Sequence, residues 1–295
     1  MTHSPRPDIS VIGPGRVGTA LARRAVLAGY RVVGVAGRDA DRAEQAARVI
    51  AAPDAVCTPE QAAARGQIVL LTVPDAAIAG VCDALAARGA FRGRAVVAHC
   101  SGALDSDVLA SARRRCGCHV ASMHPLQTFP DTAAAVEHFP GTWCFLEGDE
   151  AALPILEQFA ADLEGRPARI DAGGKALYHA AAVFACNYLT ALLDAACRAA
   201  ESAGIERRTA LAALAPLVRT TLEANLATSP AEALTGPIER GDADTVARHL
   251  AALSAQAPEL ERLYRAAGLR TADLAARKHS LSEDTYRTMY DLLHA

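Results

Sequence analysis

The sequence has no block of lysine and arginine residues and no long uninterrupted apolar segment. Its 30 basic and 33 acidic residues give a net charge of -3 and a pI near 6.3. No stripe of positive charge could neutralise a row of phosphates, so we expect no nucleic-acid partner. No segment approaches the roughly 18 continuous apolar residues typical of a membrane span. Residues 2–8 are polar and include prolines, unlike a secretory signal. We therefore expect a cytoplasmic protein that does not enter a membrane.

The sequence also has few features of a metal site. Most of its eight cysteines lie among aliphatic residues, as reduced core cysteines usually do. Cys116, Cys118 and His119 resemble half of a metal site, but no matching second half occurs elsewhere. We therefore expect no bound metal.

The length and composition predict a folded protein of two domains. At 295 residues and 30.7 kDa, the chain is longer than one hydrophobic core normally supports. Apolar residues make up 51% of the chain and charged residues 21%, as in ordinary globular proteins. The change in pattern near Asp171 predicts one domain over residues 1–171 and a second over 172–295.

The two parts differ in their expected secondary structure. In the first part, short apolar strands alternate with helices, which predicts a doubly wound, mostly parallel Rossmann-type sheet. The expected strands are Ile9–Ile12, Arg31–Ala36, Ile68–Val73, Ala95–Ala98, His119–Met123, Trp143–Leu146 and Ala168–Asp171. The second part has no strand signal and is rich in alanine and leucine, which favours an all-helical domain. Its expected helices cover residues 175–203, 207–226, 243–254, 256–267 and 271–277.

A glycine motif follows the first expected strand and predicts a dinucleotide site. The motif consists of Gly13, Pro14, Gly15, Arg16, Val17 and Gly18. Its first glycine permits a tight turn, the second lets the pyrophosphate approach the backbone, and the third lets helix and strand pack closely. Free N–H groups at the helix start then bind the phosphate. The alternative is a glycine turn that binds no ligand.

The end of the second strand favours NADP over NAD. An NAD site usually has an acidic residue here, which binds the ribose 2′-hydroxyl. In this sequence Arg38 stands at that place and can pair with a 2′-phosphate, with Arg42 as a second charge. The alternative is that Arg38 is solvated and Asp39 binds the ribose.

Two further turns are candidates for binding the nicotinamide end of the cofactor. Val73, Pro74 and Asp75 end the third strand, and Cys100 and Ser101 follow the fourth. Both turns should lie at the carboxyl edge of the sheet, where open α/β sheets bind ligands. Alternatively, Ser101 only caps the following helix.

Lys175 and His179 lie four residues apart and therefore on one face of the long helix. A lysine at a helix N-terminus opposes the helix dipole, which suggests a function. Lys175 could bind a substrate carboxylate or donate a proton, and His179 is a second donor. Asn187, further along, could face the same cleft. The alternative is a solvated Lys175 and a structural His179.

Two loops complete the candidate site. His124 follows a strand end at the same edge and could position the substrate, or simply bond to backbone beside Pro125. The polar segment 234–242 interrupts the helical part and could close the cleft, although helix termination alone would also explain it.

Several motifs together resemble a known family. They are VIGPGRVG at 11–18, VPDAAI at 73–78, HCSGAL at 99–104, MHPLQTF at 123–129, KALYHAAAVFACNY at 175–188 and LTGPI at 234–238. The chain resembles Rossmann-like oxidoreductases with a helical C-terminal domain of unassigned function. These are relatives of pyrroline-carboxylate reductase, ketopantoate reductase and 6-phosphogluconate dehydrogenase.

The resemblance implies an NADPH-dependent reductase and a homodimer formed through the helical domain. In the relatives, an inward lysine and an asparagine four residues later perform acid–base chemistry. Lys175 matches the lysine, but His179 replaces the asparagine, so the proton donor is open. A small carboxylated ketone, with ketopantoate as the leading candidate, is the expected substrate. An imine reductase or a dinucleotide-binding sensor without turnover is the alternative.

Overall fold

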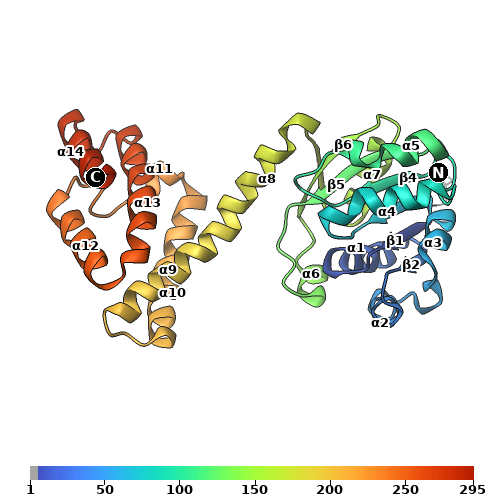
Figure 1. Cartoon of the computed structure of the whole chain (residues 1–295), viewed down its shortest axis with the longest axis horizontal. Coiled ribbons are helices and arrows are strands. Elements are labelled where there is room, and N and C mark those ends of the chain that lie inside the picture. The colour runs from blue at the N-terminus through green and yellow to red at the C-terminus, as the bar shows by residue number, and fades with distance from the viewer. Residues whose placement is uncertain (1–5) are drawn as a thin grey trace. The chain divides into compact units, whose positions relative to one another are not determined.

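The computed structural model describes residues 6–295, and the chain divides into two compact units. The first unit ends at Cys186 and the second begins at Asn187. The division falls later than the expected domain boundary after residue 171. The reason is that Lys175 and Tyr178, at the start of the long helix, bond to residues of the sheet and its loops. Figure 1 labels the elements of both units.

The first unit contains a seven-stranded sheet in the order β2-β1-β3-β4-β5-β6-β7. The strands are β1 (Ile9–Ile12), β2 (Val32–Ala36), β3 (Ile68–Leu71), β4 (Val96–His99), β5 (His119–Pro125), β6 (Trp143–Gly148) and β7 (Arg166–Arg169). All neighbouring strands are parallel except β5 and β6. From β1 the chain first adds β2 on one side and then β3 on the other side. Open α/β sheets bind ligands at the point where the strand order reverses in this way. The expected doubly wound sheet is confirmed.

Helices cover both faces of this sheet. One face packs against α1 (Arg16–Leu27), α2 (Ala40–Ile50) and α7 (Leu153–Asp162), and the other against α3 (Pro59–Arg65), α4 (Asp75–Ala87) and α5 (Ala110–Cys116). Successive strand residues alternate between the faces. In β3, Ile68 and Leu70 join the first core and Val69 and Leu71 join the second. Because both faces are buried, most residues of the inner strands are apolar.

Short elements complete the first unit. They are η1 (Pro53–Ala55), η2 (Ser106–Leu109), α6 (Thr132–Glu137), η3 (Ala172–Gly174), α8 (Lys175–Val183) and the start of a π-helical turn, η4 (Phe184–Tyr188). The elements η3, α8 and η4 lead directly into the helices of the second unit.

The second unit is helical, as expected. Its helices are α9 (Leu189–Ser202), α10 (Arg207–Ala227), α11 (Pro230–Ala233), α12 (Ala243–Gln256), α13 (Pro258–Arg277) and α14 (Glu283–His294). Two expected helices, 256–267 and 271–277, form the single helix α13. Gly268 lies within this helix. Leu293 of α14 packs so close to its Cα that a Cβ would not fit. Helix α14 was not predicted, and it supplies Met289 and Leu293 to the core.

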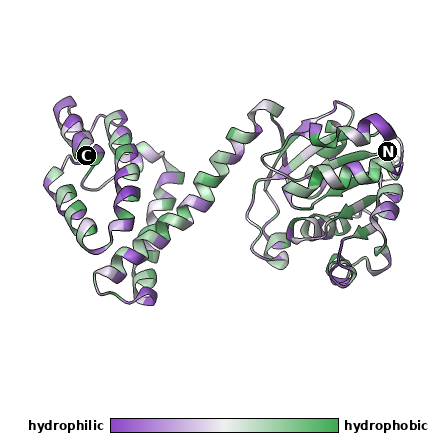
Figure 2. Ribbon diagram, viewed as in Figure 1, coloured by the Kyte–Doolittle hydropathy of each residue, from purple (hydrophilic) through white to green (hydrophobic). Residues whose placement is uncertain are grey.

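One helical segment, Ala172–Ser202, is long and apolar enough to cross a membrane by length and composition. Its most apolar window has a mean hydropathy of 1.5, and 6% of that window is buried. Figure 2 shows hydrophobic colours along much of this segment. The sequence has no continuous apolar run here, because residues such as His179 and Asn187 interrupt it. A single such helix is weak evidence for a membrane span.

Candidate active site

The glycine loop joins β1 to α1 and lies against the end of β3. Gly13 has a φ of +91°, and a Cβ there would lie 2.5 Å from Val73 Cγ1. The loop is held in place by the Thr72 hydroxyl, which donates a hydrogen bond of 2.7 Å to the Gly13 carbonyl. A Cβ on Gly18 would lie 2.2 Å from Thr72 Oγ1. Both positions therefore require glycine.

Gly15 differs, because the space beside its Cα is open. Its nearest atom is the Gly13 carbonyl, 4.0 Å from an ideal Cβ. Gly15 caps α1 without a side chain, so the first N–H groups of the helix can bind an anion. Arg16 and Val17 begin that helix, and Arg16 Nη1 donates to the Pro130 carbonyl at 3.0 Å. This arrangement fits the pyrophosphate of a dinucleotide.

Arg38 is exposed in the loop after β2. Its neighbour Asp39 caps α2, accepting a hydrogen bond of 3.1 Å from Arg42 N. Asp39 Oδ2 also lies 3.4 Å from Arg42 Nε. The Asp39 carboxylate thus already accepts a local hydrogen bond, whereas Arg38 is exposed and follows Gly37, which lies beside Pro14 of the glycine loop.

The turns after β3 and β4 are joined through Ser101. Its hydroxyl donates to Asp75 Oδ2 at 2.6 Å and accepts from the backbone N–H groups of Ala103 and Leu104. Ser101 caps no helix, because Ala103 and Leu104 lie in a bend and Asp105 caps the η2 that follows. Pro74 precedes α4, and Asp75 is its first residue. Burial raises the pKa of the Cys100 thiol to about 12, so this thiol is protonated and unreactive.

Two imidazole rings converge on Gly102, just beyond Ser101. An ideal Cβ on Gly102 would lie 2.5 Å from His179 Nδ1 and 2.9 Å from His124 Nε2. The two rings meet edge to face, with centroids 5.8 Å apart. His179 Nδ1 is buried and has no hydrogen-bond partner among the described residues. Two ring nitrogens thus point to one place at the carboxyl edge of the sheet.

Tyr178 completes this group. Its hydroxyl lies 2.8 Å from His124 Nδ1. Burial lowers the pKa of His124 to about 4, so the ring is neutral at pH 7. Burial also raises the pKa of Tyr178, so its phenol keeps its proton. If Tyr178 donates to Nδ1, then Nε2 carries the hydrogen and can donate beside Gly102.

Lys175 points into the protein. Its side chain is 2% exposed, and its ammonium donates to the Ser101 carbonyl at 3.0 Å and to the Ser122 hydroxyl. Glu147 Oε1 lies 3.7 Å away. Desolvation lowers the pKa of Lys175, although Glu147 opposes this effect. The alternative of a solvated Lys175 is not seen, and the ammonium faces protein groups rather than open space.

The other candidates belong to the second unit. Asn187 is exposed in η4 and is the first residue of the second unit. Segment 234–242 links α11 to α12, where Asp242 caps α12. Among residues 6–295, no group of three or more histidine, cysteine or acidic residues could hold a metal.

Sequence reasoning missed Thr72, Gly102, Ser122, Glu147 and the role of Tyr178. Ser122 and Glu147 left a signal, because each is a polar residue within an otherwise apolar strand. A buried polar side chain needs a partner, and that requirement points to Lys175.

Family models match both parts of the chain. A model described as a Rossmann-like domain matches residues 2–125, and a domain of unknown function, DUF2520, matches residues 142–271. The chain combines a Rossmann-like domain with a DUF2520 domain. The DUF2520 match begins at β6 and continues into α13, so it includes Glu147, Lys175 and His179. No curated protein matches the sequence.

Solved structures of the same fold cover nearly the whole chain. A protein of Bacteroides fragilis to which NADP oxidoreductase activity is ascribed has a TM-score of 0.73 and 23% identity, covering 94% of this chain and 99% of its own. A Thermotoga maritima protein has a TM-score of 0.69 and 24% identity, covering 92% and 99%. A 1-pyrroline-5-carboxylate reductase of Streptococcus pyogenes has a TM-score of 0.59 and 16% identity, covering 98% and 100%. These likenesses show that the chain shares the fold of these proteins.

Proposed function

We propose that this protein is an NADPH-dependent reductase, an oxidoreductase that reduces the carbonyl of a small carboxylated ketone. The convergence of His124 Nε2 and His179 Nδ1 beside Gly102 carries the proposal. Gly102 follows β4, and the glycine loop follows β1. These two strands are separated by β3 alone, so both loops lie at the same edge of the sheet. When bound, NADPH supplies the hydride.

The imidazoles bind and polarise the reacting oxygen. Tyr178 donates to His124 Nδ1, and His124 Nε2–H donates to that oxygen. As the carbonyl carbon takes up hydride, the C–O π bond breaks and the oxygen takes the Nε2 proton, while Nδ1 receives the Tyr178 proton and water restores it. A neutral imidazole is an effective electrophile when its tautomer is fixed by a second hydrogen bond. His179 Nδ1, which is buried with no hydrogen-bond partner within residues 6–295, is the second contact to substrate. Leaving this atom unpaired is costly, and a bound substrate would remove that cost.

NADP is the proposed cofactor because Arg38 is exposed beside the glycine loop while Asp39 is used as a helix cap. The residues proposed to hold it are those of the glycine loop, Arg38, and the turns Val73–Asp75 and Cys100–Ser101. A reductive aminase of Aspergillus terreus shares this fold and was solved with NADPH, which supports this choice.

The substrate class stays open to one alternative. Ketopantoate is the leading ketone, on the family resemblance of the sequence. Imine reduction is the second candidate, because a pyrroline-5-carboxylate reductase and a reductive aminase share this fold over nearly the whole chain. A carbonyl oxygen and an imine nitrogen each need one proton when hydride reaches the carbon, so the same histidines serve either reduction and the substrate panel separates the two.

A substrate panel tests the proposal. Purified protein is incubated with NADPH and each of several 2-keto acids, including ketopantoate, and cyclic imino acids, including pyrroline-5-carboxylate. NADPH oxidation is followed by absorbance. We expect turnover of a keto acid and its loss in His124→Phe, with unchanged NADPH binding by fluorescence titration. NADPH binding without turnover of any compound would instead indicate a dinucleotide-binding sensor.

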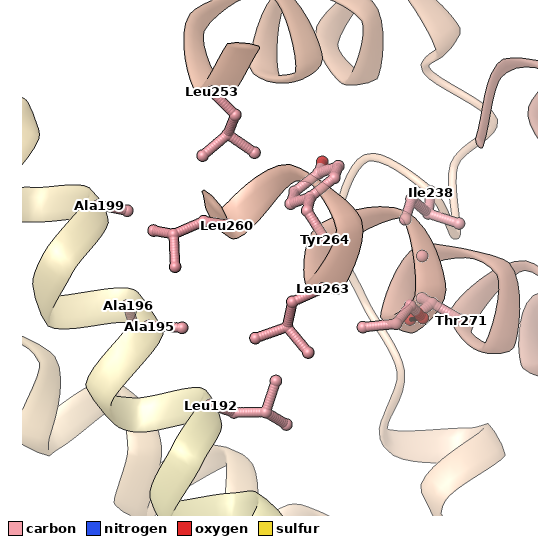
Figure 3. Close-up of a pocket in the computed structure, with 12 residues that line it drawn as sticks. Leu192, Ala195, Ala196, Ala199, Ile238, Leu253, Leu260, Leu263, Tyr264 and Thr271 are labelled. Carbon is pink, nitrogen blue, oxygen red and sulfur yellow. Dashed lines mark hydrogen bonds between the residues drawn. The ribbon is translucent and has the colours of Figure 1, made fainter. Parts of the chain in front are cut away.

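We further propose that two copies of the chain associate through the helical unit and that the protein is cytoplasmic. Leu217 and Leu226 of α10 are 63% and 78% exposed, and Leu192 of α9 is 44% exposed. Large contiguous apolar surfaces are rare on monomers. An apolar cavity of about 280 Å³ also opens between α9 and α13, where Leu192 faces Leu263 (Figure 3). A second copy would bury these surfaces.

A further inference from the structure

A row of three buried polar residues crosses the sheet. His99 of β4 pairs with Ser122 of β5, and Ser122 pairs with Glu147 of β6. Their exposed fractions are 0%, 0% and 5%. Apolar residues occupy the corresponding places along most of the sheet, such as Leu71 beside His99. A buried polar row in an apolar sheet is costly unless its members are paired.

Each member of the row has a protein partner. His99 Nδ1 accepts from Ser101 N, and its Nε2 bonds to the Asp105 carbonyl at 2.9 Å. Glu147 Oε2 accepts from the Ser106 hydroxyl at 2.8 Å. Glu147 Oε1 has no hydrogen bond among the described residues, and the nearest cation is the Lys175 ammonium at 3.7 Å. Charge rather than a hydrogen bond therefore joins Lys175 and Glu147.

The choice of lysine is informative in this chain. The 30 basic residues include only two lysines, Lys175 and Lys278. The pocket at residue 175 offers the ammonium the Ser101 carbonyl, the Ser122 hydroxyl and Glu147 Oε1. An ammonium has three donors, whereas a guanidinium has five in a planar fork. The pocket thus matches one compact cation.

Lys175 also sets the position of the two residues of α8 that are used in the proposed site. Lys175 is the first residue of α8, and Tyr178 and His179 follow in the next turn. A helix is stiff over one turn of about 5.4 Å, so fixing its first residue fixes the rotation of that turn. Moving the ammonium would therefore move the His179 ring against Gly102.

We propose that Lys175 and Glu147 are a positioning pair, which holds α8 so that His179 faces Gly102 and Tyr178 bonds to His124, and that neither exchanges a proton with substrate. This inference rests on the proposed reductase function. It assigns to Glu147 a role in the site and changes the role expected of Lys175. Burial raises the pKa of Glu147 and lowers that of Lys175, as for a pair sealed from solvent.

A double replacement separates positioning from proton donation. Lys175→Met and Glu147→Met each leave one buried charge unpaired, and a misplacement of about 1 Å in the site lowers kcat by up to about 100-fold. The double variant removes both charges and keeps the side-chain volumes. We expect its kcat to recover to within about tenfold of the wild type, because a buried ion pair can be replaced by apolar side chains without loss of the fold. The pH profile of kcat should keep both limbs of the wild-type profile.

Proton donation predicts the opposite result. If Lys175 were the general acid, the double variant would stay about 100- to 10,000-fold slower, like Lys175→Met, because the acid is missing in both. Loss of the alkaline limb of the pH profile in the double variant would also overturn the proposal.

The matched control is an ion pair of α13, outside the candidate site. Arg265 Nη2 lies 2.8 Å from Glu261 Oε1, and these side chains are 25% and 23% exposed. Arg265→Met and Glu261→Met should leave kcat and its pH profile unchanged.

Thermal unfolding keeps the test independent of the reductase proposal. Each single variant at Lys175 or Glu147 should melt below the wild type, and the double variant should melt above at least one of them. If the melting temperature of the double variant fell by the sum of the two single shifts, the positioning pair would be refuted, even if no substrate is ever reduced. If Lys175→Met does not fold, Glu147→Gln, which can keep the Ser106 hydrogen bond, replaces it as the single variant. Glu147→Gln should likewise melt below the double variant, and the opposite order would overturn the pair.

Discussion

Replacing Gly102 by alanine should disable the proposed site while leaving the nucleotide site intact. The added Cβ would lie 2.5 Å from His179 Nδ1 and 2.9 Å from His124 Nε2. An ordinary contact is about 3.5 Å, so the His179 ring must move by about 1 Å and the His124 ring by about half of that. Neither ring can simply rotate away, because His124 is bonded to Tyr178 and packs edge to face against both Tyr178 and His179.

The expected magnitude follows from this displacement. A misplacement of about 1 Å lowers a rate by up to about 100-fold, which is about 3 kcal/mol of transition-state stabilisation. Overpacking costs about 1–3 kcal/mol of stability, of which the reduced freedom of the unfolded chain offsets about 0.4–1 kcal/mol. The variant should therefore fold, bind NADPH with an unchanged Kd and reduce substrate slowly.

The measurements are kcat for the compound found in the substrate panel, NADPH titration by fluorescence and urea unfolding. Gly80→Ala is the matched control, because Gly80 lies in α4 and an added Cβ meets nothing within 4 Å. This control should keep full activity and gain up to about 1 kcal/mol of stability from helix propensity. A Gly102→Ala variant with wild-type kcat would refute the placing of the reacting oxygen between the two imidazoles.

Three further predictions test other parts of the molecule. Arg38→Ala should weaken NADPH binding by about 10- to 100-fold, the value of a charge-assisted contact, and leave NADH binding unchanged; an unchanged NADPH titration would remove Arg38 from the site. Burial lowers the pKa of His99 to about 4, below its ordinary value of 6.5. The stability that the neutral ring contributes is therefore fully present above pH 6.5 and is lost as the pH falls toward 4. The free energy of unfolding, measured in urea, should therefore be about 3 kcal/mol lower at pH 4.5 than at pH 7. Equal values at the two pH values would contradict a buried neutral His99 ring. Leu217→Asp with Leu226→Asp should halve the mass measured by light scattering, whereas an unchanged mass, or binding of the wild type to phospholipid vesicles, would argue against a second copy on this surface.

The local pattern of the sequence was sufficient for the nucleotide end of the site. The Gly13–Gly18 motif between a strand and a helix predicts the loop that the structure contains. Glycine conformation and helix N–H groups are local properties, so neighbouring residues decide them. The same holds for Asp39, whose capping of α2 involves residues within one helical turn.

The division of roles between Lys175 and its neighbours could not be read in the same way. Helical spacing correctly put Lys175 and His179 one turn apart, but it does not say which groups they meet. Lys175 bonds to residues 74 and 53 positions away in the chain, at Ser101 and Ser122. The orientation of α8 against the sheet, rather than the spacing, makes its ammonium a buried group.

The sequence by itself determined the alternation of strands and helices, the glycine loop and the helical second part, because these follow from periodicity and local backbone freedom. Only the tertiary structure decided that His124, His179 and Gly102 converge, and that Lys175 faces Glu147. Side chains from β4, β5, β6 and α8 meet there through the order of the strands and the packing of a helix. Those contacts join distant residues, and no short stretch of sequence contains them.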